Sequence, residues 1–322
     1  MNDACYCSSD GKIYGVSGPY VIQCNGTTGR REDYVRVASP LMGDMRICYH
    51  AATTSMYVSA IWQPNMQEVN YIFPPVGTPF LSRNIFPVST AMVVGTRIDM
   101  DAIYENAPPY GGFQWIGSNG IYLYVVRPVS GNTGTTSRYG FCRFDPTNLA
   151  DIGTNSSNRF RPEQCAFSPT QVAQPTPNLA ANNSQLRVSN LAVSSDDEVY
   201  LLPNNPCAVE YCTSTSKFYA VCGSDTMCRV DTITPFPGTF TPLNLGAVEA
   251  SADPCRIRYW PFPGTQKLYL PCMTSNTVIV WDPVTDTGEA KTGFENPVDV
   301  VFTNSKAFAV QNSAIGLREI TT

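Results

Sequence analysis

The sequence has very little histidine, and this limits the chemistry that the chain can perform. Its 322 residues include one histidine, His50. Most Ser-His-Asp, Cys-His and multi-histidine metal mechanisms need histidine as a base or ligand, so they are excluded unless His50 is their centre. His50 lies in Cys48-Tyr49-His50-Ala51, at the end of an expected strand. We interpret it as a structural or surface residue.

The common catalytic sequence motifs are missing as well. No GxSxG, HExxH, Walker-type or GxGxxG pattern occurs, and sialidase-like Asp boxes are absent. Without a nucleophile motif or a clear set of metal ligands, we expect the chain not to be an enzyme.

The chain also lacks a basic surface and a long apolar run. It has 21 Lys and Arg against 26 Asp and Glu, a net charge of −5, so nucleic acid is not an expected partner. No apolar run approaches the roughly 20 residues that span a bilayer, so we expect no transmembrane segment. No signal peptide precedes Asp3, and we therefore expect the chain to be a mature or partial form of a longer precursor.

A repeated β-unit is the strongest positive feature of the sequence. Lys267–Pro271 and Thr277–Trp281 read as two short strands joined by a polar turn, and Asp282-Pro283 ends the second strand. The second strand of this unit recurs along the chain as KIYGV from Lys12, MYVSA from Met56, IYLYV from Ile121, VYLL from Val199 and KFYAV from Lys217. Repetition of a β-unit at roughly 40–50 residues predicts a β-propeller, in which each blade buries its face against the next.

The clearest copies resemble a known repeat family. KLYLPCMTSNTVIVWDPVTDTGEA, from Lys267, is similar to the repeat of YVTN-type β-propellers, and NPVDVVFTNSKAFAV, from Asn296, is similar to a strand pair of YVTN and NHL repeats. The resemblance covers about the last 70 residues well and the middle of the chain poorly. It implies a propeller fold and, through YVTN-like surface-layer proteins, a structural role outside the cell. Propellers host many unrelated activities, so the repeat itself says little about function.

We therefore predict an all-β protein with one domain, residues 1–322, built as a propeller of seven blades. Six blades with long insertions is the alternative. Residues 74–111 and 153–188 lose the pattern and are expected to form long loops, with a strand candidate at Thr90–Val94 in the first of them. The last unit holds only about three strands, and we expect an N-terminal strand to complete it.

Twelve cysteines, an even number, predict disulfide bonds and an oxidising compartment. They lie partly in turns and polar loops, without a CxxC pair: Cys5, Cys7, Cys24, Cys48, Cys142, Cys165, Cys207, Cys212, Cys222, Cys228, Cys255 and Cys272. The nearest pairs are Cys222–Cys228, Cys207–Cys212 and Cys142–Cys165. The alternative is a set of buried free thiols, which are common in protein cores.

Three N-x-[ST] sequons agree with export from the cell. They begin at Asn25, Asn155 and Asn182, each in an expected turn or loop. We predict that at least one of them carries a glycan.

Two acidic clusters and a set of aromatic residues are the remaining candidates for ligand binding. Asp99, Asp101 and Glu105 could present oxygens to calcium, whereas Ser195–Glu198 reads as an acidic turn. Both clusters are also compatible with solvated loops, so no cofactor is expected, with calcium as the alternative. The aromatic residues are candidates for sugar stacking, although core packing is the default reading; they are Tyr110, Phe113, Trp115, Trp260 and Phe262.

Together these features predict a secreted or cell-surface propeller that acts as a structural or adhesive subunit of an extracellular assembly, through self-association or contact with other extracellular proteins and glycans. A carbohydrate- or protein-binding module that uses the loop face is the first alternative. A calcium-dependent, lactonase-like hydrolase is the second.

Overall fold

The computed structural model describes most of the chain in separate stretches. The described residues are 1–37, 45–60, 84–99, 115–128, 139–148, 151–155, 164–176, 185–190, 197–203, 206–223, 225–231, 239–254, 256–262, 264–313 and 316–321. By its internal contacts the chain divides into two compact units, Met1–Arg159 and Phe160–Thr322.

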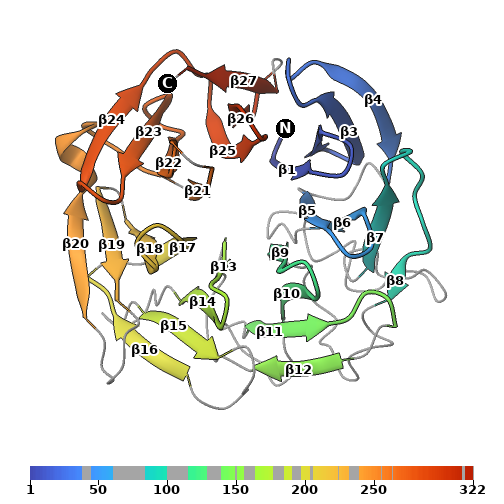
Figure 1. The fold of residues 1–322 in the computed structure, drawn as a ribbon, viewed down its shortest axis with the longest axis horizontal. Helices are drawn as coiled ribbons and strands as arrows, with labels where there is room; N and C mark the ends of the chain where they lie inside the picture. Colours follow the sequence, from blue (N-terminus) through green and yellow to red (C-terminus); the bar gives the residue numbers. More distant parts are fainter. Residues whose placement is uncertain are drawn as a thin grey trace, which may run out of the picture. The chain divides into compact units, whose positions relative to one another are not determined.

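Unit 1 consists of three antiparallel sheets with four strands each (Figure 1). The first sheet holds β1 (Asp3–Cys7), β2 (Lys12–Ser17), β3 (Tyr20–Asn25) and β4 (Arg31–Arg36); the second β5 (Met45–His50), β6 (Ser55–Ala60), β7 (Asn84–Ser89) and β8 (Ile98–Asp99); the third β9 (Trp115–Ser118), β10 (Leu123–Pro128), β11 (Tyr139–Phe144) and β12 (Asp151–Asn155). First strands of neighbouring sheets lie side by side, β1 with β5 and β5 with β9.

Unit 2 consists of three four-stranded sheets and one three-stranded sheet. Their strands are β13 (Ala166–Phe167), β14 (Gln171–Thr176), β15 (Gln185–Asn190) and β16 (Asp197–Leu201); β17 (Pro206–Cys212), β18 (Lys217–Cys222), β19 (Thr226–Val230) and β20 (Phe240–Asn244); β21 (Arg258–Trp260), β22 (Lys267–Cys272), β23 (Thr277–Asp282) and β24 (Thr287–Lys291); and β25 (Pro297–Phe302), β26 (Ala307–Gln311) and β27 (Leu317–Ile320). Here too first strands are neighbours, since β17 contacts both β13 and β21, and β21 contacts β25.

The seven sheets confirm the predicted seven-bladed β-propeller and exclude the six-bladed alternative. The second strand of each sheet carries its core, because its side chains pack on both faces between neighbouring blades. A tyrosine recurs there in almost complete burial, as Tyr14, Tyr57, Tyr124, Tyr219 and Tyr269. The apolar-Tyr-apolar pattern of the repeat is therefore the core of the blade.

A four-residue turn recurs between paired strands. Its last residue has a positive φ in five hairpins, which begin after Cys7, His50, Cys212, Cys272 and Asp282; the residues are Gly11, Thr54, Ser216, Asn276 and Asp286. Gly, Asn and Asp adopt this left-handed conformation readily, so three of the five turns match their sequence.

Three expectations about the middle and the ends of the chain are wrong. Residues 84–99 supply the third and fourth strands of the second sheet, and Thr90–Val94 is a turn with a single bridge, Val88 to Val94. Between 153 and 188 the described residues hold the end of β12, all of β13 and β14, and the start of β15 instead of a long loop. Strand β1 is the first strand of its own sheet, while the last sheet has three strands in the described part.

Polar composition caused the error at residues 153–188. Strand β14 has the sequence QVAQPT, yet Val172, Ala173 and Gln174 are buried, and Pro175 pairs with Leu186 of β15. Tertiary packing overrides the low strand propensity of Gln and Pro at these positions. In the described part of the chain, no helix has the length and apolar character needed to cross a membrane.

Candidate functional site

The last two strands of the first blade, β3 and β4, present an exposed aromatic and basic surface, which we call the edge patch: Tyr20, Arg31, Tyr34 and Arg36. In the pairing of β3 with β4, Arg31, Tyr34 and Arg36 lie opposite Cys24, Ile22 and Tyr20. Residues two apart on β3 share a face, and a register shift at Gln23/Cys24 brings Arg31 onto the same face. All four side chains therefore lie on one face of the sheet.

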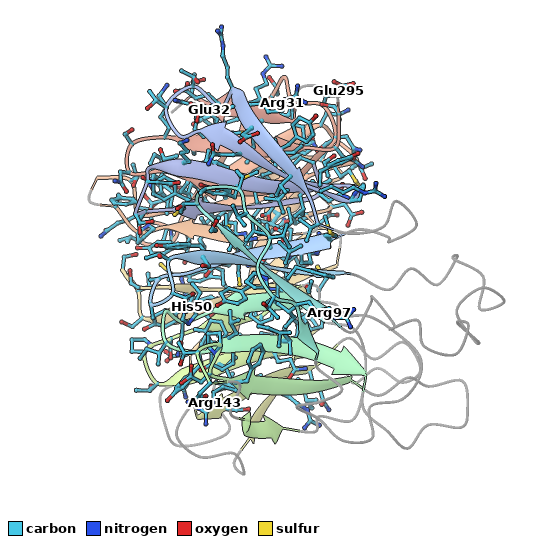
Figure 2. The ribbon with its side chains drawn as sticks, turned by 90° about the vertical axis from the view of Figure 1, so that its right-hand side faces the viewer. Arg31, Glu32, His50, Arg97, Arg143 and Glu295 are labelled. Carbon is cyan, nitrogen blue, oxygen red and sulfur yellow. The ribbon has the colours of Figure 1, made fainter. Side chains whose placement is uncertain are left out.

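The contacts within the edge patch are specific. Tyr34 is 58% exposed and meets Tyr20 edge to face at a centroid distance of 5.8 Å. The Arg31 guanidinium carbon lies 5.6 Å from the centre of the Tyr34 ring, as expected for a cation–π contact. Arg31 and its neighbour Glu32 lie at the periphery of the blade (Figure 2).

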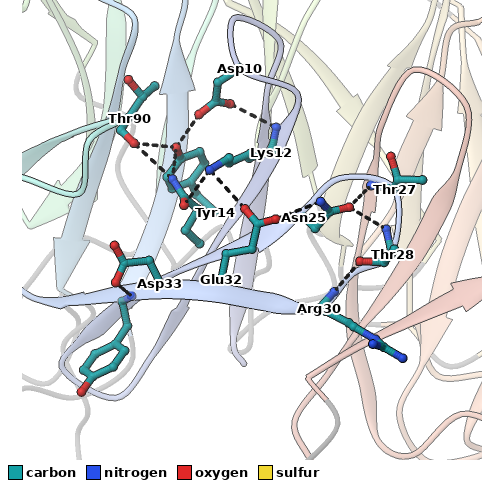
Figure 3. Close-up of polar contacts among 12 residues, drawn as sticks. Asp10, Lys12, Tyr14, Asn25, Thr27, Thr28, Arg30, Glu32, Asp33 and Thr90 are labelled. Atoms are coloured by element: carbon teal, nitrogen blue, oxygen red, sulfur yellow. Dashed lines mark hydrogen bonds and ion pairs between the residues drawn. The ribbon is translucent and has the colours of Figure 1, made fainter.

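The acidic neighbour of the edge patch is neutralised within the blade (Figure 3). Glu32 accepts a hydrogen bond from Asn25 Nδ2 at 2.9 Å and pairs with Lys12 Nζ at 3.1 Å. The Asn25 hydrogen bond and Lys12 hold the pKa of Glu32 below its ordinary value. Glu32 is thus bound by Asn25 and Lys12 within its own blade.

A buried tyrosine links the first blade to the second. Tyr14 Oη lies 2.6 Å from Asp10 Oδ2 and 3.2 Å from the carbonyl oxygen of Thr90, and it accepts a hydrogen bond from Gln23 Nε2 at 2.7 Å (Figure 3). Burial and the Asp10 carboxylate raise the pKa of Tyr14. Because Thr90 follows β7, this network fixes the blade that carries the edge patch against its neighbour.

In unit 2, a second group of polar residues lies on and beside the first strands of four blades. We call it the inner cluster: Gln164, Glu210, Arg256, Arg258 and Asp299. Arg258 of β21 binds Asp299 of β25 through two hydrogen bonds, Nε to Oδ1 at 2.8 Å and Nη2 to Oδ2 at 2.6 Å. Asp299 is 1% exposed and also accepts the backbone N–H of Val300. Such a bidentate, buried pair fixes the two blades to each other.

Gln164 connects the other strands of the inner cluster. Its side-chain amide binds both backbone groups of Ile257, donating to the carbonyl oxygen at 2.6 Å and accepting from the N–H at 3.2 Å. It also donates to Glu210 Oε2 at 3.1 Å, while Glu210 Oε1 accepts the N–H of Tyr211. Burial raises the pKa of Glu210 to about 7 despite the opposing effect of Arg258.

Unit 1 uses a similar arrangement between its first two blades. Asp3 is buried and accepts the N–H groups of Ala4 and Ile47, and Arg46 donates to the carbonyl oxygen of Asn2. Buried carboxylates and arginines on first strands are therefore contacts between blades in both units.

His50 is fully buried among the strands of unit 1 (Figure 2). Its Nδ1 is bound to Thr53, whose hydroxyl also accepts a hydrogen bond from Tyr57, and the Tyr57 ring meets the imidazole edge to face at 5.9 Å. This position agrees with the structural interpretation of His50.

The predicted calcium ligands are not brought together by the described part of the structure. Asp99 is the last residue of β8, its side chain is not among the described ones, and Asp101 and Glu105 lie outside the described residues. Among the residues that are described, no three His, Cys, Asp or Glu side chains form a group able to hold a metal ion.

The three sequons differ in their surroundings. Asn25 ends β3, and its side-chain oxygen accepts the N–H groups of Thr27 and Thr28 while its nitrogen donates to Glu32 (Figure 3). Asn155 is the last residue of β12 instead of a loop residue, and Asn182 lies outside the described residues. Glycosylation of these residues stays a prediction.

Ten cysteines are free thiols in the structure, which contradicts the predicted bridges among them. Eight of the ten are buried, and Cys5 and Cys207 are partly exposed. Cys207 and Cys212 cannot pair because they are five residues apart on one strand, β17. The other free thiols are Cys7, Cys24, Cys48, Cys165, Cys212, Cys222, Cys228 and Cys272.

Cys222 and Cys228 are neighbours but remain thiols. Cys228 pairs with Ala220 across β18 and β19, so Cys222 lies diagonally from it on the same face. The hydrogen bond between the two sulfurs raises the pKa of Cys222 and lowers that of Cys228.

Cys165 is free and buried, while the side chain of Cys142 and all of Cys255 are outside the described part.

The aromatic residues proposed for sugar stacking belong to the core where they are described. Trp260 is 4% exposed and stacks on Phe302 at 5.5 Å, and Phe262 packs against the same cluster. Trp115 is buried as well, and Tyr110 and Phe113 lie outside the described residues. Core packing, the default reading, is confirmed for Trp115 and Trp260.

Sequence reasoning did not find the edge patch or the inner cluster. Strand β4 has the sequence REDYVR, in which an exposed tyrosine between charges was the only signal. Gln164 of the inner cluster binds the backbone of Ile257, which lies 93 positions further along the chain. The sequence alone does not indicate that residues so far apart along the chain are in contact.

Comparisons with known proteins show the fold and no more. No family model matches the sequence, so membership of the YVTN or NHL families is not shown, and curated proteins give no match either. Hydrazine synthase from Kuenenia stuttgartiensis is similar in structure, with a TM-score of 0.71 and 13% identity, over 99% of this chain and 95% of that chain. A chain of the mitotic checkpoint complex has a TM-score of 0.67 and 10% identity, over 99% of this chain and 86% of that chain. An enzyme and a protein complex thus share the architecture of this seven-bladed β-propeller.

Proposed function

We propose that this chain is a non-enzymatic propeller that works by association, as a subunit of a larger protein assembly. The edge patch is the observation that carries the proposal. Exposed Tyr and Arg side chains held in fixed mutual contact are the residue types that contribute most to protein interfaces. One of the similar structures belongs to a protein complex, which agrees with an interaction role.

A second copy of this chain is the partner that the charges favour. The edge patch is basic, while the chain as a whole carries a net charge of −5. A basic patch on one copy that meets acidic surface on the next makes a head-to-tail contact, and such contacts produce rings or filaments. Strand β4 is also the last strand of its sheet, so one edge has no neighbouring strand in the described part of the chain.

The proposal also places this assembly at the cell exterior. The ten free thiols remove the disulfide argument for an oxidising compartment. The three sequons and the resemblance to surface-layer propellers still favour an extracellular or cell-surface protein.

Sedimentation velocity of the full chain at about 1–100 µM tests the association. We expect the wild type to form larger species with rising concentration and Arg31→Ala/Tyr34→Ala to remain monomeric. Phe240→Ala is the matched control, because Phe240 is 37% exposed on the outer strand β20 of another blade. A wild type that stays monomeric throughout, or a double variant that associates like the wild type, would overturn the proposal.

A further inference from the structure

The guanidinium group of Arg256 is buried without a counter-ion among the residues that the structure describes. Arg256 is 2% exposed, and within this described part neither Nη1 nor Nη2 has a hydrogen-bond partner. Guanidinium groups stay protonated in proteins, and a buried charge without a partner is strongly unfavourable. The two Nη atoms therefore need acceptors.

The carboxylates of the inner cluster do not supply these acceptors. Both oxygens of Asp299 are bound by Arg258. Glu210 accepts hydrogen bonds from Gln164 and from the Tyr211 backbone. Each described acid of the inner cluster thus has its own donors, and the positive charge of Arg256 is left over.

The backbone that carries Arg256 is held in place. Gln164 is 1% exposed and binds both the N–H and the carbonyl oxygen of Ile257, the next residue in the chain. Arg256 also lies near Cys165, since its charge opposes the effect of burial, which raises the pKa of that thiol. A neutral thiol does not balance a guanidinium. The backbone beside Arg256 is therefore fixed before a ligand binds, which lowers the entropy that the site loses on binding.

We propose that Arg256 is the anchor of a ligand site for an oxyanion group, either the carboxylate or the phosphoryl group of a small molecule. Two oxygens of such a group accept parallel hydrogen bonds from Nη1 and Nη2, the planar geometry in which arginine binds carboxylates and phosphates. The ligand neutralises the one unmatched charge of the inner cluster. This site lies in unit 2 and does not depend on the edge patch.

Calorimetric titration of the full chain with sodium acetate and with sodium phosphate, at constant ionic strength set by sodium chloride, tests the site. We expect saturable binding of at least one of the two anions. Comparing the affinity for acetate with the affinity for phosphate identifies whether the site takes a carboxylate or a phosphoryl group. Arg256→Gln should weaken this binding about 10- to 100-fold, the effect of losing charge-assisted hydrogen bonds. Arg97→Gln, which removes one exposed positive charge from unit 1 outside the edge patch, should leave it unchanged.

A second measurement covers the case in which Arg256→Gln does not fold. Crystals of the wild type soaked in selenate, a tetrahedral oxyanion, should show anomalous density beside Nη1 and Nη2 if the site takes phosphoryl groups. Arg256→Lys, which keeps the charge but loses the planar pair of donors, should bind more weakly than the wild type. Neither anion binding in the titration, or equal binding by wild type and Arg256→Lys, would overturn the proposal.

Discussion

Glu210 shows how a single residue makes the stability of the molecule depend on pH. Its folded-state pKa is about 7, above the ordinary value of 4.5, because burial disfavours the charged form. Below pH 4.5 both states are protonated, and as pH rises towards 7 the unfolded chain releases a proton that the folded chain retains. The stabilising contribution of protonated Glu210 is therefore lost between about pH 4.5 and 7.

Glu210→Gln should remove this loss. We expect the free energy of unfolding in urea, measured from pH 4.5 to 8, to fall less with pH in the variant than in the wild type, by on the order of 1–2 kcal/mol for a partly exposed group. Glu32→Gln is the control, because the effect of Glu32 on the pH dependence of stability has the opposite sign. The lowered pKa of Glu32 stabilises the fold at pH values above the ordinary pKa of glutamate, and this stabilisation is lost as pH falls. Identical pH profiles for wild type and Glu210→Gln would contradict the assignment.

The burial of single residues was predictable where it follows from their position in the repeated β-unit. The buried tyrosines follow from the apolar-Tyr-apolar strands, and the structural reading of His50 follows from its place at the end of a strand. The partners of Arg258, Gln164 and Glu210 come from other blades. A sequence pattern describes one blade, so these partners could not be predicted from it.

At the scale of the element, the four-residue turn offers a direct test of backbone strain. Thr54 has a φ of 48° and is exposed, although β-branched residues are strongly disfavoured in the left-handed region. Asn276 occupies the same position of another hairpin with a φ of 57°. Thr54→Asn should therefore raise the free energy of unfolding by roughly 0.5–1 kcal/mol.

Urea denaturation of Thr54→Asn beside Thr54→Val measures this strain. Thr54→Val keeps the branched side chain, so we expect no gain in stability from it. A gain shared by both variants would show that the hydroxyl group, and not the backbone conformation, determines the effect.

The strands differ in how well the sequence predicts them, for a physical reason. Strands β22 and β23 combine β-branched and aromatic residues with clear turns, and their bounds match the expectation closely. Strands β7, β13 and β14 contain Pro, Gln or only two residues, and packing between neighbouring strands stabilises them more than their own propensity does. The number of blades was predictable because the clear copies of the β-unit fix the length of the repeat. The less regular copies then account for the remaining stretches of the chain.

At the scale of the whole molecule, the twelve cysteines show why their number alone does not determine whether they form disulfides. An even number of cysteines in a chain with sequons predicts disulfides, but the described sulfurs lie mainly on core strands, where a thiol packs as a small apolar side chain. Cys24 and Cys272 are examples, since burial raises the pKa of each thiol to about 11. Strand position therefore determines the state of these cysteines more than their count does.

Thiol labelling of protein from its natural source measures that state directly. In the native protein at pH 7.5 we expect N-ethylmaleimide to modify at most four thiols rapidly: partly exposed Cys5 and Cys207, and the two cysteines whose side chains are not described, Cys142 and Cys255. The eight buried thiols should react only as the chain unfolds, because the reagent cannot reach them in the folded protein. In urea without a reductant all twelve cysteines should be labelled. Fewer than twelve would mean that bridges form in the cell, and would restore the argument that the assembly works in an oxidising compartment.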